Sequence, residues 1–230
     1  MSRRSADSAI ERGEVTVNGQ VARLGDKIEV GADEVFYRGK KIVPPVADNK
    51  ICIMLNKPRG IVCTANDEKG RTNVTELVRG VKDAAGKSVR LYPVGRLDMD
   101  SDGLLLLTND GELANKLTHP RHSIPKVYHV TLKGDFDSAS LNLLGEPIDI
   151  DGKETLRVKV TKVGKTDGGT VAQFELYEGR NRQIRRMCEA HGVKILQLTR
   201  VAIGKLRLGD LPVGKYRTLT KDEIHYLKTV

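Results

Sequence analysis

The segment from Tyr92 to Gly111 constrains the fold more than any other part of the sequence. It places an acidic turn, Asp98 to Gly103, directly before the continuous apolar run Leu104 to Leu107. A continuous apolar run of this kind is typical of a strand that is buried on both faces. A carboxylate at the end of such a strand is held rigidly and partly shielded from water, which suits a nucleophile or a general base. The pattern alone also fits a structural acidic turn between two core strands.

Longer motifs in this segment point to a particular family. Gly95-Arg96-Leu97-Asp98 is followed by Gly103-Leu104-Leu105-Leu106 and by Thr108-Asn109-Asp110-Gly111. These motifs resemble the catalytic signature of pseudouridine synthases, and they are closest to the RsuA-type family (RsuA, RluB, RluE and RluF), which modifies bacterial ribosomal RNA. The resemblance implies that Asp98 acts on the ribose. It also implies that Arg96 fills the space left when the target base is flipped out of the RNA.

Two later segments extend the resemblance. Residues 126–132 alternate as a strand and resemble the Lys-x-Tyr strand of the family, which implies that Tyr128 packs against the target base. Without this resemblance, an aromatic residue on such a strand would be read as part of the hydrophobic core. The run 178–188 predicts a helix with an inward apolar stripe of Ile184, Met187 and Cys188. In the family, the cation that pairs with the catalytic aspartate falls at Arg185, where it would keep Asp98 ionised and oriented.

Basic side chains near these motifs are candidates for RNA contact. The chain carries 39 Lys and Arg against 30 Asp and Glu, a net charge of +9. Such a charge favours binding to a polyanion such as nucleic acid, but many basic proteins bind none. Basic turns and arginine rows are also common as solvated surface. The candidate RNA-binding residues are Arg96, Lys57, Arg59, Arg180, Arg182, Arg186, Arg3 and Arg4.

The sequence predicts a small N-terminal module before the main domain. Ser2 would cap a helix, and Asn18-Gly19 after an alternating run predicts a hairpin. This order resembles the S4 RNA-binding module, with its first helix missing. Residues 1–43 carry eight basic and seven acidic side chains, so RNA binding, a structural appendage and a mobile arm all remain open for this module. We place a linker at residues 44–49 and the pseudouridine synthase domain at residues 50–230.

The main domain is predicted to be α+β, with a mixed, mainly antiparallel sheet, flanking short helices and a central cleft. Asp110 would cap a helix that ends at His119, and the capping box from Thr220 to Glu223 would begin another. A short helix is expected after Asn73. The remaining strands are expected at residues 155–163, 170–177 and 193–202, with a long hairpin loop at 164–169.

The implied reaction requires no cofactor. Uridine and pseudouridine are isomers, so neither redox chemistry nor group transfer from a second molecule is involved. The sequence contains no phosphate-binding loop, no dinucleotide fingerprint and no metal-ligand spacing. Three widely spaced cysteines and the absence of a long apolar run predict a cytoplasmic protein without a membrane span. We expect a monomer.

The resemblance also implies a substrate. The motif at residues 181–187 resembles family members that act on 23S rRNA, and residues 111–120 are closest to the RluB branch. We therefore expect a uridine near the peptidyl transferase region, in 23S rRNA or a pre-ribosomal particle. Two alternatives are a 16S rRNA synthase and a non-catalytic rRNA-binding assembly factor. A third is a hydrolase that uses Asp98 and Asp100 as an acid/base pair, but adjacent turn positions seldom give the opposed carboxylates that glycoside cleavage needs.

Overall fold

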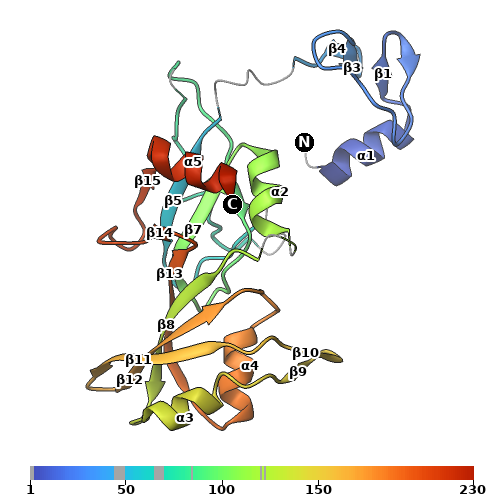
Figure 1. Ribbon diagram of the computed structural model, residues 1–230. Coiled ribbons are helices and arrows are strands. Elements are labelled where there is room, and N and C mark those ends of the chain that lie inside the picture. The colour runs from blue at the N-terminus through green and yellow to red at the C-terminus, as the bar shows by residue number, and fades with distance from the viewer. Residues whose placement is uncertain (1–2, 44–49, 65–69, 84, 120, 122) are drawn as a thin grey trace. The chain divides into compact units, whose positions relative to one another are not determined.

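The computed structural model describes all residues except 1–2, 44–49, 65–69, 84, 120 and 122, and it divides the chain into two compact units, Met1–Asn49 and Lys50–Val230 (Figure 1). The first unit contains helix α1 and a four-stranded antiparallel sheet of order β2-β1-β3-β4. The predicted helix and hairpin are confirmed, with Asn18 and Gly19 both at positive φ in the turn. The elements are α1 (Arg3–Glu11), β1 (Val15–Val17), β2 (Gln20–Val21), β3 (Val35–Tyr37) and β4 (Lys40–Lys41).

The second unit is built on a nine-stranded sheet. Its main path runs β11-β12-β8-β13-β7-β5-β15, with β14 paired to β13 and β6 paired to β7. Only the β13–β7 pair is parallel among these neighbours, so the predicted mixed, mainly antiparallel sheet is confirmed. The strands are β5 (Cys52–Lys57), β6 (Tyr92–Val94), β7 (Asp102–Thr108), β8 (Lys126–Lys133), β11 (Lys159–Thr166), β12 (Gly169–Leu176), β13 (Ile195–Ile203), β14 (Leu206–Arg207) and β15 (Tyr216–Thr218).

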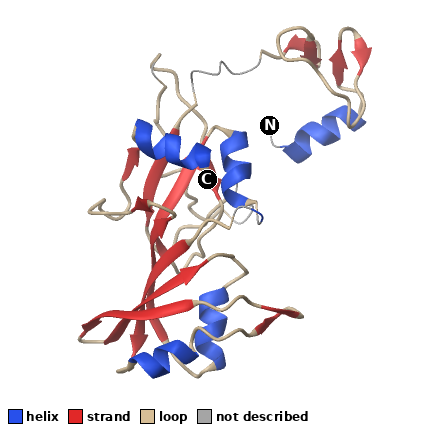
Figure 2. Ribbon diagram, in the orientation of Figure 1, coloured by secondary structure: helices blue, strands red, loops and turns tan. Residues whose placement is uncertain are grey.

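Short helices flank the two halves of this sheet. Figure 2 shows α2 and α5 beside the half that contains β5 and β7, and α3 and α4 beside the half that contains β11 and β12. Asp110 caps α2 and a capping box of Thr220 and Glu223 starts α5, as predicted. A separate ribbon is formed by β9 and β10. The bounds are α2 (Gly111–Thr118), α3 (Ser138–Leu143), α4 (Gln183–Ala190), α5 (Lys221–Thr229), β9 (Asp149–Ile150) and β10 (Lys153–Glu154).

The central strand β7 is buried on both faces, as its apolar run predicts. Leu104 and Leu106 pack in one cluster with residues of α2 and α5. Leu105 and Leu107 pack on the opposite face, against the segments that precede β7. A third cluster lies between the other half of the sheet and the apolar stripe of α4, which consists of Ile184, Met187 and Cys188.

Two local predictions were wrong. Residues 74–80 form turns instead of a short helix, because the side chain of Asn73 accepts hydrogen bonds from the backbone and the hydroxyl of Thr75. The expected long loop at 164–169 is a tight turn, since Thr166 pairs with Gly169 and a bulge between Lys162 and Gly164 absorbs the irregularity. None of the helices in the described ranges is long and apolar enough to cross a membrane.

Candidate active site

Asp98 lies on a tight turn that a buried lysine holds from below. The backbone N–H of Ser101 donates to the Asp98 carbonyl at 3.1 Å, which closes the turn. Lys57, with no exposed surface, donates from Nζ to the carbonyls of Ser101, Pro58 and Asp98 at 2.8, 3.0 and 3.1 Å. The side chain of Asp98 is 28% exposed. The carboxylate is therefore accessible while its backbone is fixed.

The residue before Asp98 fixes the other side of the turn. Leu97 is buried in the core cluster below β7 and donates its N–H to Sγ of Cys63 at 3.3 Å. Burial raises the pKa of the Cys63 thiol, and the hydrogen bond from Leu97 and nearby cations oppose this effect. The thiol therefore stays protonated at neutral pH and serves as a packing group.

Gly103 allows β7 to approach β13 closely. It has φ of +104°, and a Cβ at this position would lie 2.4 Å from the backbone oxygen of Arg200. Only glycine tolerates both the backbone conformation and this approach. The contact between Gly103 and Arg200 joins the two halves of the sheet beside the acidic turn.

Two arginines, one at the N-cap of α4 and one within its first turn, face the acidic turn. Arg182, at the start of the helix in the left-handed conformation, lies 3.5 Å from a carboxylate oxygen of Asp98 and makes a bidentate contact with Asp100 at 3.1 and 3.3 Å. Arg185 donates to the Asp100 carbonyl at 3.0 Å and to the Ser101 hydroxyl at 3.1 Å, and its ion pair is with Asp100 at 3.3 Å. Arg182, and not the expected Arg185, therefore forms the ion pair with Asp98, while the Asp100 carboxylate contacts both guanidinium groups.

The arginines change the acidity of Asp100. Partial burial by itself raises the pKa of Asp100, but the hydrogen bond from Arg182 and the charges of Arg185 and Arg182 outweigh it, and the pKa is lowered. Asp100 is thus ionised at neutral pH. Asp100 acts as a counterion for both Arg182 and Arg185. The Asp98 carboxylate, in contrast, has a single ion pair within the described part of the chain, the 3.5 Å contact with Arg182.

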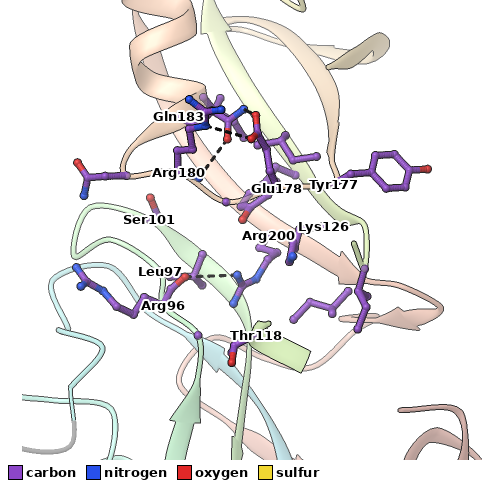
Figure 3. A pocket seen from close by; sticks show the side chains of 18 of the residues that line it. Arg96, Leu97, Ser101, Thr118, Lys126, Tyr177, Glu178, Arg180, Gln183 and Arg200 are labelled. Atoms are coloured by element: carbon purple, nitrogen blue, oxygen red, sulfur yellow. Dashed lines mark hydrogen bonds and ion pairs between the residues drawn. The ribbon is translucent and has the colours of Figure 1, made fainter. Parts of the chain in front are cut away.

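A cleft of about 810 Å³ opens beside this turn. Asp98, Tyr128, Arg182 and Arg185 all line it, as does Arg96. Tyr128 lies on β8, half-buried, and packs against two of the core clusters. Figure 3 shows the cleft with Arg96 and Ser101 on one side and the segment from Tyr177 to Gln183 on the other. The structure thus brings the acid, the aromatic residue and the basic helix into one cavity.

The guanidinium group of Arg180 is hydrogen-bonded to other groups of the protein. Its guanidinium donates to the carbonyls of Lys153 and Glu154 at 2.6 and 2.5 Å and to the Glu178 carboxylate at 3.1 Å. Gln183, which is buried, donates to the Glu178 carboxylate at 2.8 Å. Arg180 therefore anchors the β9–β10 ribbon to the rim of the cleft instead of offering a free charge.

Other candidate RNA-binding residues differ from the expectation. Lys57 cannot contact RNA, because it is fully buried and its Nζ is occupied by three carbonyls. Arg59 is half-exposed and bonds to Asp102 at 3.3 Å and to the Leu196 carbonyl at 2.9 Å. Arg186 pairs with Asp151 at 2.9 Å. Arg4 is exposed on α1 in the other unit, and the side chain of Arg3 lies outside the described residues.

Sequence reasoning missed two cations of the cleft. Arg200 is only 4% exposed, lies on β13 and lines the cleft, as does Lys126 at the start of β8. The signal for Arg200 was a charge in the middle of the predicted strand 193–202, but only the strand register places it beside Tyr128. Among the described residues, no group of three or more His, Cys, Asp or Glu side chains is placed to hold a metal ion.

Comparisons with known proteins agree with this site. Residues 51–190 match the family model described as RNA pseudouridylate synthase. The chain is 38% identical over its whole length to ribosomal large subunit pseudouridine synthase B of Bacillus subtilis (strain 168), covering 91% of that protein. It is 40% identical to the dual-specificity RNA pseudouridine synthase RluF of Salmonella typhi, over 97% of this chain and 73% of the relative. A crystal structure of a pseudouridylate synthase superposes with a TM-score of 0.67 at 30% identity, over 99% of this chain and 94% of the other.

The mixed sheet and its cleft with a carboxylate turn define an enzyme of the class that isomerises uridine within RNA. The chain belongs to the RNA pseudouridylate synthase family. The family resemblance inferred from the motifs around Asp98 is thereby confirmed.

Proposed function

We propose that this enzyme converts a specific uridine of ribosomal RNA to pseudouridine, in 23S rRNA near the peptidyl transferase region. The name of the Bacillus subtilis relative, a ribosomal large subunit pseudouridine synthase, supports ribosomal RNA as the substrate and favours 23S rRNA. The observation that carries the proposal is the placement of Asp98 on a rigid turn in the cleft that Tyr128 also lines.

In the proposed reaction, Asp98 acts on the ribose of the flipped nucleotide. The N1–C1′ bond breaks, the uracil turns over, and a C5–C1′ bond forms. C5 then loses its proton and N1 gains one, so the product is an isomer of the substrate. Asp98 either attacks C1′ and is displaced when C5 bonds to C1′, or removes the C2′ proton to give a glycal and returns that proton as the C5–C1′ bond forms. Both routes require its ionised carboxylate.

The surrounding residues have separate proposed roles. Tyr128 would stack on the uracil and relay the C5 proton. Arg182 and Arg185 would orient the acidic turn and attract the RNA backbone. The target base has to leave its stack, at a cost of a few kcal/mol. Arg96, which is exposed at the edge of the cleft, would occupy the vacated position.

The N-terminal unit is proposed to be a shortened S4-like RNA-binding module, with Arg3 and Arg4 at its phosphate-contacting position. Its helix followed by a hairpin supports this assignment. We further propose that the enzyme is a cytoplasmic monomer that acts on 23S rRNA or a pre-ribosomal particle. Arg4→Gln would weaken RNA binding if this module contributes to it, and would leave binding unchanged if the module is a structural appendage.

The proposal is tested by mapping pseudouridines in 23S and 16S rRNA from cells that lack the gene. Carbodiimide adducts that block reverse transcription report each modified position. One missing 23S site, restored by the wild-type gene but not by Asp98→Asn, would support both the reaction and the substrate. A missing 16S site would contradict the substrate, and complete maps in a strain without a redundant enzyme would favour a non-catalytic assembly factor.

A further inference from the structure

Three side chains of the cleft share one face of the sheet. Tyr128 on β8 is directly opposite Arg200 on the antiparallel strand β13. Lys126, two residues before Tyr128, points to the same face because side chains alternate along a strand. All three line the cleft, and Figure 3 shows Lys126 and Arg200 next to each other between its two walls.

Arg200 carries a buried charge without a counterion. Its Nε donates to the Leu104 carbonyl at 2.7 Å and its Nη1 to the Arg96 carbonyl at 3.4 Å, while Nη2 has no hydrogen-bond partner. Both acceptors are neutral. Burying a cation costs free energy unless an anion lies next to it. Among the described residues of the free enzyme, no anion compensates the buried charge of Arg200.

Lys126 adds a second cation above the first. Its pKa is lowered by burial and by the charge of Arg200, which indicates that the two groups repel each other. Within the described part of the chain, no ion pair is formed by either cation. The two carboxylates that line the cleft are engaged elsewhere, Asp98 with Arg182 and Glu178 with Arg180.

We propose that Lys126 and Arg200 form a phosphate subsite in the floor of the cleft, in which Lys126 donates to a phosphodiester oxygen and Arg200 supplies the charge beneath it. The inference rests on the proposed function. Phosphate is favoured over a uracil carbonyl because a neutral acceptor would leave two adjacent cations uncompensated. A nucleotide that is flipped into the cleft brings its own phosphodiesters with it. The subsite would thus hold the backbone beside the flipped uridine while Tyr128 contacts the base.

The test is the salt dependence of binding to unmodified 23S and 16S rRNA transcripts. Each lost phosphate contact reduces the slope of log Kd against log salt by about 0.7 to 0.9. We expect this reduction for Lys126→Gln. The matched control is Lys133→Gln, which removes an exposed lysine at the other end of β8, on the opposite face, and should keep the wild-type slope. Equal slopes for Lys126→Gln and the wild type would overturn the subsite.

A second variant tests the buried charge. Arg200→Met, if folded by circular dichroism, should also lower the slope, and an unchanged slope would remove Arg200 from the subsite. The Lys126 result stands even if Arg200→Met does not fold, because Lys126 is only half-buried. Binding is measured without turnover. A wild-type enzyme that binds both transcripts but modifies neither would therefore contradict the proposed function without deciding the subsite, whose outcome still follows from the slopes.

Discussion

Lys57 stabilises the acidic turn that carries Asp98, and its side chain has no contact with solvent. Lys57→Met would leave three carbonyls, one buried and two partly buried, without their shared donor, and we expect a loss of about 2 to 4 kcal/mol in the free energy of unfolding. Urea denaturation measures this loss. The control is Lys87→Met, which replaces an exposed lysine and should stay within about 0.5 kcal/mol of the wild type. Equal stability of the two variants would show that the lysine does not hold the turn.

Ionisation of Asp100 makes the stability of the folded protein depend on pH. Its pKa is lowered in the folded protein, so its ionised form contributes stability above the unfolded pKa of about 3.9. This contribution is lost as the pH falls through the lower, folded pKa. We expect Asp100→Asn to be less stable than the wild type at pH 7, by at most about 1 kcal/mol because the carboxylate is half-exposed. The difference should begin to shrink below about pH 4 and vanish once the pH lies below the folded pKa of Asp100. A difference that persists in acid would mean that charge is not its cause.

The roles of individual side chains were only partly predictable from the sequence. Asp98 was identified because its motif is contiguous. The roles of Lys57 and Asp100 depend on contacts across 44 and 82 residues of sequence, and neither residue's neighbours along the chain indicate them. For the same reason the motif alone could not choose between Arg182 and Arg185, since the ion pairs of both arginines with Asp100 are contacts between distant parts of the sequence.

The junction of β7 and β13 depends on one glycine. In Gly103→Ala the new Cβ would meet the Arg200 carbonyl, and the backbone would be strained at positive φ, so we expect a loss of about 3 kcal/mol or more. Thermal or chemical unfolding measures it. Gly111→Ala is the control, because that position opens into free space at the start of α2 and should be neutral or slightly stabilising. A tolerated Gly103→Ala would contradict the close approach of the two strands.

Strands and helices with a strong local pattern were predicted well. The run Leu104–Leu107, the alternating strand that begins at Lys126 and the capped helices α2 and α5 all follow from local residues. The strand expected from Thr155 begins at Lys159 instead. The order of strands in the sheet, and hence the neighbours Tyr128 and Arg200, comes from long-range pairing that no local pattern contains.

The division of the chain into two units leads to a further prediction. Every residue that lines the cleft belongs to Lys50–Val230. A truncated chain of residues 50–230 should therefore fold and keep its kcat within about threefold, because no group in contact with the reacting atoms is lost. Any RNA contacts of the first unit would be seen as a higher KM. Loss of kcat in a folded truncation would show that residues 1–49 complete the catalytic site.

The most direct test of the account is the fate of the C5 proton. A transcript labelled with tritium at C5 of uridine releases tritium to water when pseudouridine forms. With the wild type, and with the control Asp210→Asn on an exposed loop, we expect release at equal rates. With Asp98→Asn, release should fall by at least about 10³-fold, because the acting carboxylate is absent. Release by Asp98→Asn at the wild-type rate would contradict the assignment of Asp98 as the catalytic residue.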